Sequence, residues 1–245
     1  YMNNRKIFMT FMSNIFDPYK KEIKENAGKA SCDRGDGKDF SLMAHQKIVR
    51  DYINLYTPYR GLLLYHGLGS GKTCTSIAIA EGIKTSRPII VMTPASLRMN
   101  YVEELKKCGD SIYKKNQFWE FIHTEGKPEL VDILSKILSL SLEYIRKQQG
   151  AWLVNVTKQP NFGFLDSTAK TSIDSQINEM IRYKYRFINY NGLRISHLRE
   201  LSKNYEKNPF DNTVVIIDEA HNFVSRIVNK LKKPESLSMR LYEYI

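Results

Sequence analysis

The stretch LLLYHGLGSGKT, residues 62–73, is the strongest local signal in the sequence. An apolar run leads into glycines at alternate positions, and residues typical of a helix follow Lys72. This order predicts a strand at residues 61–66, a glycine-rich loop, and a helix at residues 72–84. Glycines let successive backbone N–H groups face one centre, and the start of the helix adds its positive dipole end. The stretch therefore predicts a phosphate-binding loop.

Most positions of this loop have an expected role. Lys72 would neutralise charge on the β- and γ-phosphates of a nucleotide, and the Thr73 hydroxyl would coordinate Mg²⁺. The pattern departs from G-x-x-x-x-G-K-[ST] at its first position, which holds His66. We interpret this histidine as a packed or hydrogen-bonded side chain without a catalytic role. The residues expected to hold the nucleotide here are Gly67, Gly69, Ser70, Gly71, Lys72 and Thr73.

A second apolar run, at residues 213–217, ends in the two acids Asp218 and Glu219. It predicts a buried strand that delivers both carboxylates to the carboxyl edge of a sheet, where ligands of α/β proteins bind. Asp218 would hold Mg²⁺ through water, and Glu219 would orient or deprotonate the attacking water. In isolation the pair could equally be a solvated acidic turn, but its combination with a phosphate loop favours the catalytic interpretation.

The rest of the chain alternates between strand and helix signals. Further strands are predicted at residues 88–93, 152–156 and 186–190, and helices at residues 42–55, 96–107 and 131–145. Repeated alternation with continuous apolar strands predicts an α/β fold, with a mostly parallel sheet covered by helices on both faces.

The N-terminal region differs in composition from the remainder. Residues 1–19 carry aromatic and apolar groups at helical spacing, which predicts a helix that packs on the main body. Residues 20–39 are charged and contain three glycines, which predicts a linker. We therefore expect a helical extension and linker over residues 1–39 and one large domain over residues 40–245. A helical insertion is expected around residues 127–175, within the long stretch between Leu97 and Thr213.

Composition narrows the possible partners. The formal net charge of +11 favours a polyanion, with nucleic acid as the first candidate, although many basic proteins bind none. Cys32, Cys74 and Cys108 are widely spaced, which fits a reducing, intracellular compartment. No apolar stretch is long enough to predict a membrane span or a signal peptide. Because the first residue is not methionine, we expect an internal piece of a longer protein.

The quoted motifs resemble those of superfamily 2 helicases and translocases of the DEAH type. The sequence DEAH at residues 218–221 resembles their motif II, and the loop that ends in GKT at Thr73 resembles motif I. The sequence VMTPASL at residues 91–97 resembles motif Ia, which contacts the nucleic-acid backbone in that family. FSLMAHQ at residues 40–46 resembles the segment in which a glutamine reads adenine, and Gln46 matches that glutamine.

Two narrower resemblances add detail. FINYNGL at residues 187–193 resembles the strand and turn that precede motif II in Snf2-like translocases. Residues 59–73 resemble helicase-type NTPases of nucleocytoplasmic large DNA viruses, relatives of the poxvirus nucleoside triphosphatase I and early transcription factor large subunit. This resemblance implies a viral protein of the virion or the host cytoplasm.

The family resemblance implies the first RecA-like lobe of a P-loop NTPase, with ATP and Mg²⁺ as cofactors. The implied catalytic residues are Lys72, Asp218, Glu219 and His221, the metal ligands are Thr73 and Asp218, and the nucleic-acid contacts are Thr93, Ser96 and Arg98. For the last group the alternative is that Ser96 only caps a helix while Arg98 is solvated. A second RecA-like lobe would supply an arginine finger, so a lone first lobe is expected to hydrolyse ATP weakly or not at all.

Two functions stay open at this point. The favoured one is an ATP-dependent nucleic-acid translocase or helicase linked to viral transcription or DNA handling, with DNA preferred over RNA and transcription-complex subunits as further partners. The alternative is a catalytically silent, nucleotide-gated interaction module of a transcription or packaging assembly. A small-molecule P-loop kinase is disfavoured, because it gives no reason for DEAH, the Thr-Pro segment and Gln46 to occur together.

Overall fold

The computed structural model describes residues 4–26, 42–53, 59–83, 87–233 and 235–245. The chain divides into two compact units, Tyr1–Gly82 and Ile83–Ile245, and each is described by itself. The helices of the first unit are α1 (Arg5–Asn26), α2 (Ala44–Asp51) and α3 (Lys72–Ile83). No described helix of either unit is long and apolar enough to cross a membrane.

In the first unit, α1 packs against α2. The rings of Phe16 and Tyr52 stack with their centroids 6.5 Å apart, and Lys47 forms an ion pair of 2.8 Å with Glu22. The helix predicted over residues 1–19 is thus confirmed where the chain is described. It also continues through residues 20–26, which were wrongly predicted as linker. Lysine and glutamate, which recur in this stretch, are good helix formers. The predicted domain boundary and residues 27–39 lie outside the described residues.

Residues 61–66 do not form the predicted strand. Their backbone is assigned neither helix nor strand, and the Leu63 side chain is 77% exposed. A buried parallel strand needs a neighbouring strand to satisfy its backbone groups. The described part of the first unit contains no strand, so the segment has no such neighbour among the described residues of this unit.

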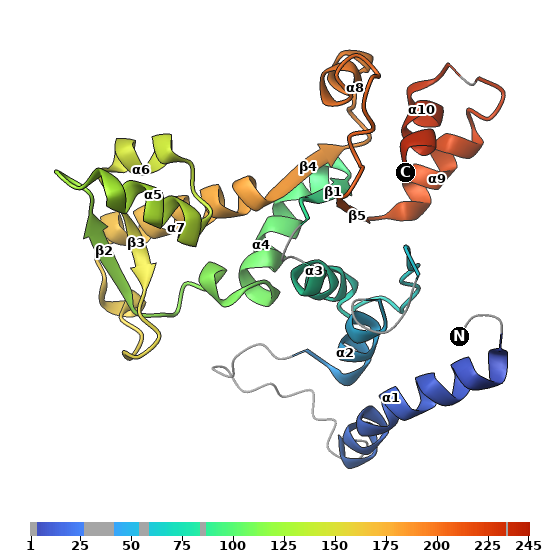
Figure 1. Ribbon diagram of the computed structural model, residues 1–245, viewed down its shortest axis with the longest axis horizontal. Helices are drawn as coiled ribbons and strands as arrows, with labels where there is room; N and C mark the ends of the chain where they lie inside the picture. The colour runs from blue at the N-terminus through green and yellow to red at the C-terminus, as the bar shows by residue number, and fades with distance from the viewer. Residues whose placement is uncertain (1–3, 27–41, 54–58, 84–86, 234) are drawn as a thin grey trace. The chain divides into compact units, whose positions relative to one another are not determined.

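The second unit begins with the parallel sheet that carries the acidic motif (Figure 1). Its strands β1 (Ile89–Thr93), β4 (Tyr185–Asn189) and β5 (Val214–Ile217) are ordered β4-β1-β5, so the first strand in sequence is central. Both ladders are parallel. The three predicted strands at residues 88–93, 186–190 and 213–217 are therefore confirmed. Every residue of β1 is buried, as expected for a strand covered on both faces.

Helices cover both faces of this sheet. On one face, β1 and β4 pack with α8 (Ile195–Leu201), α9 (Ala220–Val228) and α10 (Leu237–Tyr244). The core of this face consists of Ile90, Met92, Ile188, Tyr190, Leu198, Phe210, Phe223, Ile227 and Leu241. On the opposite face lies α4 (Arg98–Cys108), whose Tyr101 ring meets the Phe187 ring edge-on at 6.0 Å. The predicted layer order is confirmed.

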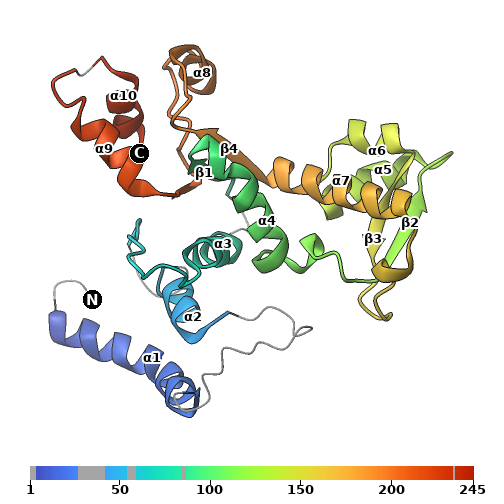
Figure 2. The same cartoon turned by 180° about the vertical axis from the view of Figure 1, so that it is seen from behind.

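The remainder of the second unit is a small mixed layer. Strands β2 (Trp119–His123) and β3 (Gly150–Val154) pair antiparallel, beside α5 (Pro128–Leu138), α6 (Leu142–Gln148) and α7 (Ser167–Lys184). The predicted strand at residues 152–156 thus exists, but it does not join the parallel sheet. Gly150 permits this pairing, because a Cβ there would collide with the Ile122 carbonyl and the Phe121 ring. Both views show α7 running from this layer towards β4 (Figures 1 and 2).

The single helix predicted at residues 131–145 is two helices. Helix α5 ends before Ser139, which takes a left-handed φ of 52°. Ser141 then caps α6 by accepting a hydrogen bond of 3.1 Å from the Tyr144 backbone N–H. Serine is a preferred N-cap residue, so Ser141 was the available signal for this break. The layer spans the expected insertion at residues 127–175 but begins earlier, at β2; its status as an insertion stays a prediction.

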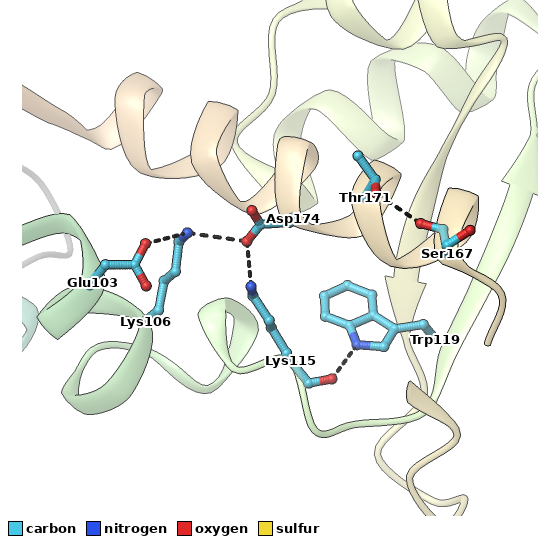
Figure 3. A network of polar contacts seen from close by, with 7 residues as sticks. All are labelled: Glu103, Lys106, Lys115, Trp119, Ser167, Thr171 and Asp174. Atoms are coloured by element: carbon cyan, nitrogen blue, oxygen red, sulfur yellow. Dashed lines mark hydrogen bonds and ion pairs between the residues drawn. The ribbon is translucent and has the colours of Figure 1, made fainter. Parts of the chain in front are cut away.

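One carboxylate joins α4 to α7. Asp174 of α7 accepts Lys106 of α4 at 3.1 Å and Lys115 at 2.7 Å, and Lys106 also meets Glu103 at 2.9 Å. Figure 3 shows Asp174 between the two lysines. The Lys106 side chain is only 8% exposed, so its charge depends on these acids for compensation.

We expect Asp174→Asn to lower the free energy of unfolding by about 1 kcal/mol at neutral pH, because it removes one partner of a partly buried charge. Burial raises the pKa of Asp174, but its contacts with Lys115 and Lys106 outweigh burial and leave the pKa lowered. A lowered folded-state pKa adds stability above the unfolded pKa of about 3.9. The difference between wild type and variant should therefore disappear as the pH falls through the folded-state value.

Urea unfolding followed by tryptophan fluorescence can measure this effect, because Trp119 and Trp152 lie in β2 and β3. Glu179→Gln is the matched control: it breaks an exposed ion pair of the same helix, that with Arg182, and should cost less than about 0.5 kcal/mol. Equal losses in the two variants, or a difference that does not shrink as the pH falls below the unfolded pKa, would contradict the bridging role of Asp174.

Candidate nucleotide site in two parts

The glycine-rich loop has the backbone shape that phosphate binding requires. Gly69 and Gly71 have φ values of +76° and +75°, a region that residues with a Cβ rarely adopt. The chain turns over residues 67–70, where the Ser70 N–H lies 3.4 Å from the Gly67 carbonyl. Helix α3 starts directly afterwards at Lys72. The N–H groups of its first turn have no partner within the helix, so they and the helix dipole can act on an anion.

The Lys72 side chain curls back over this loop. Its ammonium group donates to the carbonyls of His66 at 3.2 Å and Gly67 at 3.1 Å. The positive charge therefore lies at the loop itself, where the predicted role as a phosphate ligand requires it. Thr73 follows in the first turn of α3 and is half-buried.

The side chain of Gln46 is hydrogen-bonded to the loop. Its side chain is 2% exposed; Oε1 accepts from the Met43 backbone N–H at 2.9 Å, and Nε2 donates to the Gly71 carbonyl at 3.1 Å. The neighbouring His45 places Nε2 3.1 Å from the Ser70 carbonyl. Gln46 thus joins the start of α2 to the loop, a role that the family resemblance did not imply. Its expected contact with adenine stays a prediction.

Two buried polar atoms of the loop region lack a hydrogen-bond partner among the described residues. They are His66 Nδ1 and Ser70 Oγ. A buried polar atom without a partner is costly, and bound ligands or water commonly satisfy such atoms. The His66 ring meets the His45 ring edge-on at 5.5 Å, consistent with a packed side chain. The orphaned Ser70 hydroxyl, the loop amides and Lys72 together form a donor set that fits a nucleotide phosphate.

The acidic motif stands at the carboxyl edge of the parallel sheet. The Asp218 N–H donates to the Met92 carbonyl at 2.8 Å, which continues the pairing of β5 with β1 by one residue. The Thr93 hydroxyl lies 3.4 Å from Asp218 Oδ2 and can donate to it. Since Asn189 pairs with Thr93, the ends of all three strands meet at this edge. Asp218 therefore lies at the carboxyl edge of the sheet, as the sequence predicted.

Glu219 makes the turn from β5 into α9. It has φ 51° and ψ 48°, a left-handed conformation that costs an L-residue roughly 1–2 kcal/mol. Its Oε2 lies 3.3 Å from His221 Nδ1, and its side chain is 44% exposed. The two acids therefore point differently: Asp218 is held at the strand edge, whereas Glu219 and His221 face the surface.

Tyr190 is the residue of this part that the sequence analysis did not single out. It follows β4, and its hydroxyl lies 3.1 Å from the Asp218 carbonyl and 3.2 Å from the Glu219 carbonyl. Burial, and then the charges of the two acids, raise the pKa of Tyr190, so its hydroxyl stays a donor at neutral pH. Its place in the FINYNGL segment was the only available signal.

The three residues expected to contact nucleic acid differ in position. Thr93 is fully buried, with its hydroxyl 3.4 Å from Asp218 Oδ2, and its expected contact with nucleic acid stays a prediction. Ser96 is exposed in a short 3₁₀ turn at Ala95–Leu97, and Arg98 holds its guanidinium 5.2 Å above the Phe187 ring. Ser96 does not cap α4, because the N-cap position is Leu97.

The loop and the acidic motif belong to different compact units of the chain. A loop of this geometry, followed by a helix, and a DEAH sequence at the carboxyl edge of a RecA-like parallel sheet together define an ATPase lobe of the helicase class. More particularly, the chain belongs to the family described as "Type III restriction enzyme, res subunit", which matches residues 39–241.

Similar proteins come from large DNA viruses. The chain is 38% identical over 107 residues, 43% of its length, to a protein of Acanthamoeba polyphaga mimivirus named "Putative ATP-dependent RNA helicase". It is 26% identical over 84% of its length to a protein of Invertebrate iridescent virus 3 named "Putative helicase". It is 26% identical over 54% of its length to a protein of African swine fever virus named "Termination factor NPH-I homolog".

The chain covers 18%, 16% and 18% of these three proteins, respectively. It therefore spans less than a fifth of the length of each. No solved structure matches the chain. Family and relatives together support a viral, ATP-dependent function of the helicase type.

Proposed function

We propose that this chain is the ATP-binding lobe of a viral motor that hydrolyses ATP with Mg²⁺ and moves along nucleic acid. The observation that carries the proposal is the separation of Asp218 from Glu219 by the left-handed turn at the sheet edge. It leaves one carboxylate at the strand end and the other at the surface, as a division between metal binding and water activation requires.

The residues would share the work as follows. The amides of the loop and Lys72 would bind the β- and γ-phosphates, and Ser70 would add its hydroxyl. Thr73 and Asp218 would hold Mg²⁺, which supplies positive charge against the phosphate oxygens when bound. Glu219 would accept a proton from the attacking water, with His221 orienting its carboxylate. This division requires the loop and the acids to act on one nucleotide.

DNA is the track that we propose. The net charge of +11 favours a polyanion, and Ser96 and Arg98 offer a hydroxyl and a cation beside the start of α4. A role in transcription is supported by the relatives from African swine fever virus that are named termination factor NPH-I homologues. A second RecA-like lobe elsewhere in the complete protein would supply the arginine finger, so we expect this lobe alone to turn over ATP weakly.

ATP hydrolysis by the complete protein, with and without DNA or RNA, tests this function. DNA should raise the turnover rate several-fold, and Lys72→Ala defines the rate without a functional phosphate loop. Stimulation by RNA alone would identify RNA as the track. ATP binding without any stimulated turnover would instead favour a nucleotide-gated interaction module.

A further inference from the structure

A buried hydroxyl, that of Tyr190, contacts the turn that carries the two acids. In an extended strand, successive carbonyls point to opposite sides, whereas in a helical turn of either hand they point to the same side. The Tyr190 hydroxyl lies within hydrogen-bond distance of the Asp218 and Glu219 carbonyls together. It can reach both only while the two carbonyls point to the same side, so this contact favours the turn over the extended alternative.

The Tyr190 side chain is itself firmly placed. It is 4% exposed and belongs to the core that β1 and β4 share with α8 and α9. Its ring centroid lies 5.6 Å from that of Phe223, in the first turns of the helix that follows the acids. Core packing therefore holds the ring in place independently of the two acids. The position of the hydroxyl is set by the core.

The Tyr190 hydroxyl matters to the turn because few other described contacts restrain Glu219. Glu219 occupies the N-cap position of α9 without a side-chain capping bond, and its carboxylate meets only the exposed His221 among the contacts described. One local backbone bond, from the Asn222 N–H to the Glu219 carbonyl at 2.9 Å, closes the turn from the helix side. Tyr190 closes it from the sheet side.

We propose that Tyr190 is a positioning residue, whose hydroxyl holds the Asp218–Glu219 peptide in the turn that separates the metal-binding carboxylate from the water-activating one. This role rests on the proposed ATPase function. It gives a function to Tyr190 of the FINYNGL segment. It predicts that the hydroxyl matters to the chemical step and hardly to nucleotide binding, since Tyr190 contacts the turn that carries the acids, whereas the phosphate loop would supply the affinity for the nucleotide.

The test compares Tyr190→Phe with wild type in the complete protein. The variant keeps the ring and its packing but loses the hydroxyl. We expect kcat to fall about 5- to 15-fold, the ratio that corresponds to one lost hydrogen bond, while the KM for ATP stays within about twofold. The matched control is Tyr185→Phe, which removes a buried hydroxyl from the other end of β4 and should leave kcat unchanged.

A second readout does not depend on turnover. Hydrogen–deuterium exchange at the Asn222 amide, which bonds to the Glu219 carbonyl, reports opening of the turn and should accelerate about 5- to 15-fold in Tyr190→Phe. Faster exchange with unchanged kcat would reduce Tyr190 to a structural role and overturn the proposal. Unchanged exchange would overturn it as well. If wild type does not hydrolyse ATP, the proposed function fails by itself, and exchange still decides whether Tyr190 holds the turn.

Discussion

Glu219→Gln is expected to lower ATP turnover about 10²- to 10⁴-fold, the range that a positioned general base contributes. Glutamine has nearly the same shape but cannot accept the proton of the attacking water at neutral pH. Because the phosphate loop supplies nucleotide affinity in the proposed mechanism, the dissociation constant for ATP should stay within about threefold. Steady-state ATPase rates and titration with a fluorescent ATP analogue, both on the complete protein, measure the two quantities.

A control substitution at another glutamate distinguishes a specific effect of Glu219 from the general effect of removing one negative charge. Glu235 lies in the same unit, and its only described ion pair is an exposed one with Arg240. Glu235→Gln should therefore retain full turnover. If Glu219→Gln kept more than about a third of the wild-type rate, another group would have to be the base, and the division of labour between the two acids would be wrong.

The carboxyl-edge half of the site could be predicted because its signals are local. The run that ends at Asp218 is apolar throughout, and a strand buried on both faces needs no alternation. Its neighbour β1 has the same character, and acids directly after such a strand must fall at the sheet edge. The sequence therefore located Asp218 and Glu219 correctly, although nothing in it specified the left-handed turn at Glu219.

Strand pairing could not be predicted, because it depends on partners distant in the chain. Residues 152–154 and 89–93 are similarly apolar, yet the former pair antiparallel with β2 and the latter stand in the parallel sheet. Residues 61–66 are equally apolar and form no strand. An apolar run indicates that a segment prefers an extended and buried conformation. A strand forms only where a neighbouring strand can pair with its backbone N–H and C=O groups.

The contacts that a side chain makes within the fold could not be predicted from residue type. Thr93 suits a phosphate contact by residue type, but the last position of a buried strand directs it at Asp218. Gln46 was matched to adenine recognition, whereas its amide is engaged at both ends by Met43 and Gly71. Residue type defines what a group can bond; only the fold decides which partner is within reach.

Gly71→Ala is the second change with a large expected effect, and it tests the contact between Gln46 and the loop. Alanine at φ +75° is strained by roughly 1–2 kcal/mol. Its Cβ would also lie 2.5 Å from Gln46 Nε2, so that side chain must move and give up a hydrogen bond worth about 1 kcal/mol. Together these costs predict ATP affinity lower by roughly 30-fold or more, measured with the same fluorescent analogue.

Two comparisons isolate the cause. Gly67→Ala places a methyl group in the same loop where nothing lies within 4 Å and φ is not positive, so affinity should change less than about threefold. In a Gln46→Ala background the collision is absent and only the left-handed strain remains, so Gly71→Ala should cost about tenfold there. Because residues in contact give non-additive effects, this reduced cost is the signature of the contact. Equal costs in both backgrounds would mean that Gln46 does not support the loop, and its role would return to the nucleotide base.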